Sequence, residues 1–444
     1  MKSQSNSHRM SRLGAWLPGD RRHLGHWLRT TRTAIRRHGE KFHPIVGEFQ
    51  ELIEGDPVLR MYFTRMFQEQ PRRRLQAAWG DARVKSYIEM LEVLNHVLTR
   101  APEYNRTYMV GCPINAILDC PMITPTGLAA FADGRVNAML RRYFAVWTEF
   151  LSSEKSRYVL NDSPRGWLSA HARAHLHLDE FETDPNAPYL GFRSWNDFFI
   201  RKFKPGQRPI ASPGDSGVVI NACESAPFAI ERRVRASAAF WIKEQPYSLR
   251  DLLAGHFVEQ FVGGTVYQAF LSARNYHRWH SPVSGTIRKL EHIPGTYYAE
   301  ASSEHFDPAG PNNSQSYLAH IATRALIFID ADDPRIGLIC LVAIGMAEVS
   351  SCVLEGASAH VLREGQHLVK GEQLGYFQFG GSTHCLVFGP QVRLRFVPDA
   401  HPRGPHASKS VTLKVNSHLA TVLQRSARNR PAALPGGARI SRRP

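Results

Sequence analysis

A glycine pair followed by a hydroxyl side chain is the feature of this sequence with the clearest chemical potential. The segment 377–383 reads Phe-Gln-Phe-Gly-Gly-Ser-Thr, so Gly380 and Gly381 directly precede Ser382. Glycine leaves the backbone sterically open, and a serine hydroxyl becomes a nucleophile when a base removes its proton. Ser382 is therefore a candidate nucleophile toward the carbonyl carbon of Gly381. Taken alone, the pattern more often marks a turn between two strands.

Two histidines and an aspartate upstream supply the other groups that such a reaction needs. His277 and His280 lie in the run Tyr-His-Arg-Trp-His-Ser-Pro at 276–282, and Asp215 lies in Ser-Pro-Gly-Asp-Ser-Gly at 212–217. A histidine can take the serine proton, and a carboxylate can orient the imidazole and stabilise its charged form. A histidine beside a tryptophan is, without further context, more often a packed or surface residue. The residues of a Ser-His-Asp triad are nevertheless all present.

The order of these segments resembles the phosphatidylserine decarboxylase family of pyruvoyl enzymes. The resemblance covers roughly Trp195 to Phe396, nearly half of the chain. Further segments that agree are FFxRxxKPG at 198–206, YSLxxLL at 247–253, Pro-Gly-Thr-Tyr-Tyr at 294–298 and Val-Lys-Gly-Glu-Gln-Leu-Gly at 369–375. The family's usual SPADG reads here Ser-Pro-Gly-Asp-Ser-Gly, and this departure bears on the assignment of Asp215.

Within that family, the sequence looks closest to the fungal L-tryptophan decarboxylase branch. Three features support this likeness. They are the long N-terminal region with a helical pattern, the segment Tyr-His-Arg-Trp-His at 276–280 and the segment Ile-Gly-Met-Ala-Glu-Val-Ser at 344–350. The branch acts on a free amino acid rather than on a lipid. We therefore expect a decarboxylase of L-tryptophan or a similar aromatic amino acid.

The resemblance implies a self-derived cofactor. Ser382 is expected to attack the Gly381 carbonyl, the chain is cut at 381/382, and residue 382 becomes a covalent pyruvoyl group that acts through a Schiff base. His280 would activate Ser382, Asp215 would orient His280, and His277 would handle protons during turnover. If Asp215 is misaligned, a backbone carbonyl or another carboxylate would orient His280. The α and β chains of self-cleavage are expected to stay together, in a homodimer.

Other functions stay open at this point. Phosphatidylserine decarboxylation, which makes phosphatidylethanolamine in phospholipid biosynthesis, uses the same chemistry on a lipid head group. Residues 364–375 also look like half of a biotinyl or lipoyl carrier barrel, which would be a non-catalytic module, and a degenerate family member would never mature. His171, His175 and His177 lie near acidic residues, but they lack an HExxH order and are read as an exposed helix, with no metal site.

The net charge of +16 invites a nucleic-acid interpretation, but its location argues against one. Residues 1–39 contain nine Lys and Arg against one acidic residue, and 400–444 contain nine against none, so the body of the chain is near neutral. Such ends read as poorly ordered tails, and an Arg-rich N-terminus also fits a transit peptide. The expected location is cytoplasmic, with mitochondrial as the alternative. The six cysteines show no CxxC pair, and no run of about 18 apolar residues is present.

The pattern of elements predicts an α+β fold. Apolar residues recur at spacings of three and four from about residue 44 to 159, whereas short β-branched and aromatic runs follow Trp195. We expect a basic, poorly ordered segment at 1–43, a helical domain at 44–190, a β-rich catalytic domain at 191–400 and a basic tail at 401–444. Glu348 is a candidate for a buried polar role or for a solvent-facing strand position. His384 is a candidate pocket residue.

Overall fold

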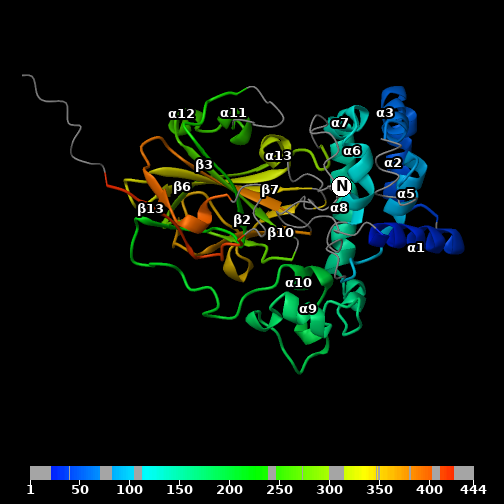
Figure 1. Cartoon of the computed structure of the whole chain (residues 1–444), viewed down its shortest axis with the longest axis horizontal. Helices are drawn as coiled ribbons and strands as arrows, with labels where there is room; N and C mark the ends of the chain where they lie inside the picture. Colours follow the sequence, from blue (N-terminus) through cyan, green and yellow to red (C-terminus); the bar gives the residue numbers. More distant parts are fainter. Residues whose placement is uncertain are drawn as a thin grey trace, which may run out of the picture.

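The computed structural model describes eleven parts of the chain, and it confirms the α+β class. These parts are residues 22–39, 41–70, 83–104, 113–238, 247–272, 274–299, 315–346, 348, 351–379, 382–402 and 411–424. Helices gather on one side of the molecule and strands on the other, with the small helices α9 (Ala170–His175) and α10 (Trp195–Phe199) beneath both (Figure 1).

The helical region packs its helices along apolar stripes. Its helices are α1 (Arg22–His38), α2 (Pro44–Gly55), α3 (Pro57–Gln68), α5 (Tyr87–Val97), α6 (Pro113–Met122), α7 (Pro125–Ala132) and α8 (Gly134–Ser152). Asp133 begins α8 because its side chain accepts a hydrogen bond from the backbone N–H of Arg135. Along α8, buried Leu140, Tyr143 and Trp147 recur at helical spacing. Helix α8 faces the strands and thereby joins the two regions (Figure 1).

Part of the segment predicted to be poorly ordered is a helix. Helix α1 covers Arg22–His38, and it packs on α5 through the buried Leu28. Arg32 of α1 also forms an ion pair with Glu89 of α5. The basic composition of this segment hid a helix with one apolar face. Residues 1–21 of the segment that was predicted to be poorly ordered lie outside the described residues.

The sheet-rich half is built on a seven-stranded sheet with the order β2-β3-β11-β7-β6-β5-β9. Its strands are β2 (Ala226–Arg232), β3 (Thr265–Leu271), β5 (Gly285–Ile293), β6 (Arg324–Ala331), β7 (Leu338–Gly345), β9 (His367–Leu368) and β11 (Ser382–Phe388). Strand β11 lies between β3 and β7 and pairs antiparallel with both, without a register shift. Three short helices complete this half, α11 (Leu249–Leu252), α12 (Val258–Phe261) and α13 (Gln315–Ile321).

Two three-stranded sheets accompany the large one. One has the order β4-β10-β8, from β4 (Arg278–His280), β10 (Gln373–Gln378) and β8 (Ser351–Leu354), and the other has the order β1-β13-β12, from β1 (Val218–Ile220), β13 (His418–Val422) and β12 (Leu394–Phe396). One hydrophobic cluster contains Trp279 and Phe377 of the first small sheet together with Leu386 of β11. We call this cluster the inter-sheet core.

The C-terminal segment differs from its prediction as a basic tail. Strand β13 lies between β1 and β12 and buries Leu419, Ala420 and Val422. The apolar run of these residues is short and lies next to basic sequence, so composition alone concealed it. The β-rich fold therefore extends beyond residue 400.

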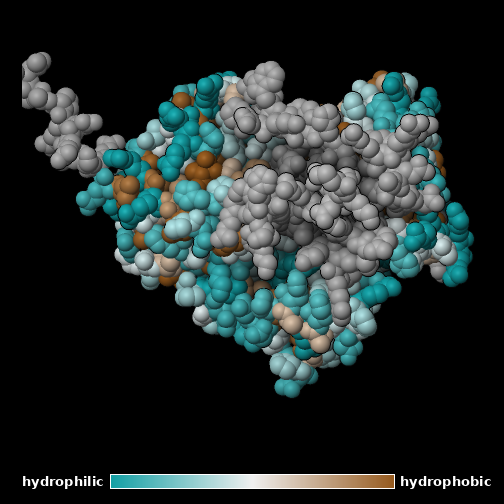
Figure 2. Space-filling view, in the orientation of Figure 1, coloured by the Kyte–Doolittle hydropathy of each residue, from teal (hydrophilic) through white to brown (hydrophobic). Residues whose placement is uncertain are grey.

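The described surface offers little apolar area on the face shown in Figure 2. Hydrophobic side chains form small separate patches there, and hydrophilic residues cover most of the described helical region. The large hydrophobic residues that are exposed include Val361 and Val369. Within the described ranges, no helix has the length and apolar character needed to cross a bilayer.

Candidate active site

Ser382 begins the central strand β11. It pairs with Leu271 of β3 on one side and with Gly345 of β7 on the other. The residue is 0% exposed, and its hydroxyl has no hydrogen-bond partner among the described residues. Buried hydroxyls are normally hydrogen-bonded, so an unsatisfied one in this position is a candidate reactive group. Gly381, on the other side of the predicted cut, lies outside the described residues.

His384 lies on the same face of β11 as Ser382, because side chains two residues apart in a strand point the same way. Leu386 and Phe388 continue this face and belong to the inter-sheet core. The residues opposite His384 are alanines on both neighbouring strands, Ala269 and Ala343, so no large side chain crowds the ring from there.

The environment of His384 keeps its imidazole neutral. Neither ring nitrogen makes a well-formed hydrogen bond within the described parts of the chain. Burial lowers the pKa of His384 to about 3, although the nearby Ala269 carbonyl opposes this change. A neutral imidazole thus sits two residues from the predicted nucleophile, on its own face of the strand.

His277 lies beside the strand that leads into Ser382. Its backbone carbonyl accepts a hydrogen bond from Phe377 of β10 at 2.9 Å, and the residue is fully buried. Its ring stacks on Phe199 of α10, with the centroids 3.9 Å apart. Phe199 in turn contacts Phe379, the last described residue before the glycine pair. Of the two predicted histidines, His277 is the one that the fold brings to the cleavage segment.

Phe379 has an unusual backbone conformation for a residue with a side chain. Its φ is +52°, in the left-handed region that favours glycine. The surrounding rings hold it there, since Trp147 of α8 and Trp195 of α10 lie 5.8 Å and 5.6 Å from its ring. Strained backbone of this kind persists where the surrounding packing imposes it, often at functional sites. Here it immediately precedes Gly380 in the sequence.

His280 is oriented by a tyrosine and a backbone carbonyl. Its Nδ1 lies 2.7 Å from the carbonyl oxygen of Gly371, and its Nε2 lies 2.9 Å from the hydroxyl of Tyr276. Burial lowers the pKa of His280 to about 4, with the Gly371 carbonyl acting in the opposite direction. On β10 the residue paired with His280 is Gln373, which is farther along the chain from Ser382 than Phe377 is.

The structure does not bring Asp215 to His280. Asp215 lies in an exposed turn, where its Oδ1 accepts a hydrogen bond from the backbone of Gly217 at 2.9 Å. Both ring nitrogens of His280 have the other partners described above. The backbone carbonyl that we considered as a substitute for a misaligned aspartate is present, from Gly371. The catalytic roles of Ser382, His280, His277 and Asp215 stay predictions.

Lys370 argues against the carrier interpretation of residues 364–375. A carrier domain exposes its modified lysine at a hairpin tip, whereas Lys370 is 3% exposed. Its Nζ donates hydrogen bonds to the carbonyl oxygens of Ser212, Asp215 and Val218. The lysine therefore ties the Asp215 turn to the turn that carries Gly371.

Glu348 is buried, and it contacts the helical region. It is 0% exposed, and its Oε1 accepts a hydrogen bond from the backbone N–H of Asn115 in α6 at 2.7 Å. The buried alternative of the sequence prediction is thus the one observed. Glu348 follows Gly345, which pairs with Ser382, so this contact connects α6 to the chain leaving the Ser382 end of the sheet.

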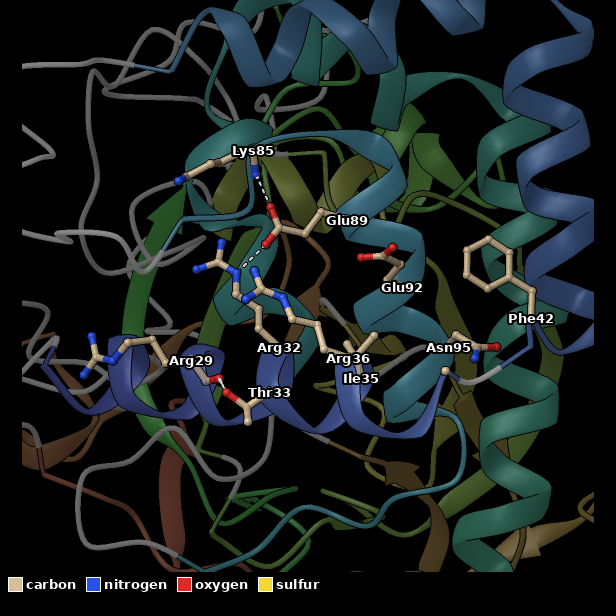
Figure 3. Close-up of a pocket in the computed structure, with 11 residues that line it drawn as sticks. Arg29, Arg32, Thr33, Ile35, Arg36, Phe42, Lys85, Glu89, Glu92 and Asn95 are labelled. Atoms are coloured by element: carbon tan, nitrogen blue, oxygen red, sulfur yellow. Dashed lines mark hydrogen bonds and ion pairs between the residues drawn. The ribbon is translucent and has the colours of Figure 1, made fainter.

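A separate hollow of about 810 Å³ lies in the helical region, between α1 and α5. Figure 3 shows Arg29, Arg32 and Arg36 on α1 and Glu89 and Glu92 on α5, with Arg32 directed at Glu89. Charged side chains dominate its lining, and none of the predicted catalytic residues takes part. The hollow is therefore distinct from the Ser382 site.

Comparison with known proteins decides the family. Two phosphatidylserine decarboxylase family models match, one over residues 43–176 and one over residues 195–405. A protein named decarboxylase iboD from Amanita muscaria is 39% identical over 333 residues, which is 70% of this chain and 91% of that protein. The chain belongs to the phosphatidylserine decarboxylase family. It is accordingly a carboxy-lyase of a pyruvoyl-dependent family.

Two further relatives separate the branches of the phosphatidylserine decarboxylase family. A protein named L-tryptophan decarboxylase from Psilocybe cubensis is 36% identical over 397 residues, covering 83% of this chain and 85% of that protein. The phosphatidylserine decarboxylase proenzyme 3 of Schizosaccharomyces pombe is 34% identical over 206 residues, only 46% of this chain and 20% of that protein. The fungal branch predicted from the sequence is confirmed.

Sequence reasoning missed two features of the site, and it named His384 as a candidate pocket residue without placing it on the face of Ser382. Strand alternation would have placed His384 on the face of Ser382, since the two are two residues apart. The contact of Asn115 with Glu348 joins residues 233 positions apart and leaves no local signal. The left-handed conformation of Phe379 also has none, because glycine rather than phenylalanine marks such positions.

Proposed function

We propose that this family member cuts itself at 381/382 and converts Ser382 into the pyruvoyl group with which it decarboxylates an aromatic amino acid. The observation that carries the proposal is the buried Ser382 hydroxyl, which has no partner within the described residues at the start of β11. A small buried residue at a strand end, beside the strained Phe379, fits a group that must form within the chain itself. The site residues are thus compatible with a pyruvoyl group.

We propose that maturation proceeds in three steps. Ser382 Oγ loses its proton to a base and bonds to the Gly381 carbonyl carbon, while the amide C–N bond breaks and the released nitrogen gains a proton. Loss of the Ser382 Cα proton then breaks the Cβ–Oγ bond and frees the Gly381 carboxylate. Addition of one water and loss of ammonia leave the pyruvoyl group on residue 382. The products are a β chain, 1–381, and an α chain, 382–444.

The fold supports association of the two chains after the cut. Strand β11 would belong to the α chain, whereas both strands that pair with it, β3 and β7, would belong to the β chain. Backbone hydrogen bonds on both sides of β11 and its buried side chains would survive cleavage. The α chain is therefore proposed to stay in the sheet.

The surrounding residues are proposed to bind substrate, exclude water and move protons. The pyruvoyl carbonyl supplies the electron sink for the carbanion that remains when carbon dioxide leaves. His277, stacked beside the cleavage segment, is proposed to hold and return the proton during turnover. His280 is proposed as the base of the maturation step, oriented by Gly371 in place of Asp215, and its Nε2 must exchange Tyr276 for Ser382 to take the proton. Trp147, Trp195 and Phe199 pack against Phe379 and are proposed to exclude water from the segment before Ser382.

A free aromatic amino acid is the substrate that the comparisons favour. The relatives named L-tryptophan decarboxylase match this chain across the helical region as well as the catalytic half. The relatives named phosphatidylserine decarboxylase proenzyme match 44–50% of the chain. Phosphatidylserine is the second candidate, because the chemistry of the catalytic half is shared with those proteins.

Denaturing intact-mass measurement of the wild type beside Ser382→Ala tests the maturation. We expect two chains from the wild type, with the smaller one beginning at a pyruvoyl-blocked residue 382, and one uncut chain from the variant. Ser382→Thr is a useful control, since it retains a hydroxyl and should cut slowly. An uncut wild type that is folded and active would contradict the proposal.

A further inference from the structure

The contact between Asn115 and Glu348 lies where the helical region meets the Ser382 end of the sheet. Asn115 sits in the first turn of α6, and its backbone N–H donates to Glu348 Oε1 at 2.7 Å. Both residues are 0% exposed. Glu348 is three residues beyond Gly345, the β7 residue paired with Ser382. Three residues of chain span at most about 11 Å, so the contact cannot lie far from the catalytic edge.

Residues of helix α8 lie near both this contact and the cleavage segment. Tyr143 and Trp147 are four residues apart and therefore share one face of α8, about one turn from each other. Burial raises the pKa of Tyr143, and the negative charge of the nearby Glu348 raises it further. Trp147 packs against Phe379 with the ring centroids 5.8 Å apart. Tyr143 of this face is thus near Glu348, and Trp147 of the same face packs on Phe379.

The side-chain amide of Asn115 has no role in holding the fold. Neither its nitrogen nor its oxygen has a hydrogen-bond partner in the described ranges, although the residue is fully buried. A buried amide without partners destabilises a protein, so its presence calls for an explanation. Since Glu348 already holds the backbone of Asn115, the side chain is available to a ligand.

Aromatic side chains surround the same part of α8. Phe144 lies 6.2 Å from Tyr298 and stacks on Tyr297 at 5.3 Å, and Phe131 of α7 lies 5.8 Å from Tyr298. Flat rings prefer such neighbours, in stacked or edge-to-face arrangements. A flat aromatic ligand bound beside α8 would find ring partners in this cluster, and the unpaired amide of Asn115 would offer it one polar partner.

We propose that Asn115 determines substrate specificity, and that its side-chain oxygen accepts a hydrogen bond from the ring N–H of an aromatic amino acid bound beside α8. Glu348 is a positioning residue that holds Asn115 through its backbone. The inference rests on the proposed amino acid decarboxylase function and names the substrate class within it. The helical region would thus contribute Asn115, which recognises the side chain of the substrate, and the sheet would contribute Ser382.

An isosteric pair of substrates tests this assignment. L-Tryptophan carries an indole N–H, whereas 3-(3-benzothienyl)alanine has sulfur in its place and nearly the same shape. A site built to hydrogen-bond a substrate N–H discriminates strongly against an analogue that lacks it. We expect the processed wild type to show a kcat/KM at least about tenfold higher for tryptophan than for the analogue.

The variant Asn115→Leu should remove that preference. We expect its kcat/KM for tryptophan to fall about tenfold or more, while that for the analogue stays within about threefold of the wild-type value. Asn186→Leu, at an exposed position, is the matched control and should keep the preference. Self-cleavage, followed by intact mass, should be unchanged in both variants.

The inference is overturned if the wild type treats the two substrates alike, a result that requires no variant. It is also overturned if Asn115→Leu keeps the tryptophan preference. If the wild type self-cleaves but turns over neither amino acid, the inference falls together with the proposed substrate while the maturation stands. If the wild type does not self-cleave, the proposed maturation is wrong, and that result is distinct from a failure of the proposed substrate.

Discussion

Two buried polar side chains of the helical region contrast with two of the sheet region. In the helices, Tyr143 donates to the Leu94 carbonyl at 2.8 Å and Trp147 donates to the Arg100 carbonyl at 3.0 Å. In the sheet region, the buried hydroxyls of Ser382 and Tyr267 have no such partners among the described residues. Buried polar groups that are hydrogen-bonded stabilise a fold, whereas those without partners destabilise it and often lie at functional sites.

Asn115 departs from the pattern of its own region. Asn137 of α8 donates to the carbonyls of Phe131 and Asp133 and accepts from the backbone of Tyr297. The amide of Asn115 is equally buried but has no partner within the described chain. The contrast supports the proposal that Asn115 serves the site rather than the fold.

The largest expected effect concerns the pH dependence of stability at His384. Because burial lowers its pKa to about 3, the unfolded state binds the proton more readily as the pH falls below about 6.5. The native state is therefore destabilised progressively between about pH 6.5 and 3, by on the order of 4 kcal/mol in total. His384→Leu should make the free energy of unfolding less sensitive to acid by that amount.

Urea unfolding of Ser382→Ala with and without His384→Leu, at several pH values between 7 and 4, measures this effect. The Ser382→Ala background is expected to keep the chain in one piece. His360→Leu, at an exposed position, is the control and should leave the slope unchanged. Identical pH slopes with and without His384→Leu would show that the unsatisfied imidazole is not the source of acid sensitivity.

The comparison of Asn137 with Asn115 should produce the next largest difference. Asn137→Leu removes three hydrogen bonds and leaves buried backbone groups unpaired, so we expect a loss of about 3 kcal/mol in the free energy of unfolding. Asn115→Leu removes no side-chain hydrogen bond and should change stability by less than about 1 kcal/mol. Urea midpoints of the two variants provide the measurement. Equal losses would mean that Asn115 is structural.

Glu348 should have an intermediate effect. Glu348→Ala leaves the buried N–H of Asn115 without its acceptor, and we expect a loss of about 2 kcal/mol in the free energy of unfolding. Glu348→Gln keeps an acceptor oxygen in the same place and should lose about 1 kcal/mol or less. Thermal unfolding of both variants distinguishes them. A larger loss for Gln than for Ala would indicate that the charge, and not the hydrogen bond, matters.

The smallest effect is expected at an exposed ion pair of the helical region. Arg165 contacts Glu103 through two hydrogen bonds of 2.7 Å, but the two side chains are 69% and 43% exposed. Glu103→Gln should therefore cost no more than about 1 kcal/mol, and less at high salt. A loss as large as that of Asn137→Leu would remove the contrast between buried and exposed polar contacts.

Local patterns made much of this molecule predictable. The helical stripes before residue 160 and the ordered segments around His277, His280 and Ser382 can be read along the chain, and they led to the family and the α+β class. Strand β13 and helix α1 were missed because basic composition outweighed short apolar patterns. The orientation of His280 by Gly371 depends on tertiary packing of two turns, and residue types do not encode it directly.

The most direct test of the account is a comparison of substrates on the processed wild type. Release of labelled carbon dioxide from carboxyl-labelled L-tryptophan would be measured beside release from phosphatidylserine vesicles, with Ser382→Ala as the blank. The account predicts carbon dioxide from tryptophan with an equal amount of the amine, much slower release from the lipid, and none from Ser382→Ala. Turnover of phosphatidylserine without turnover of tryptophan would contradict it.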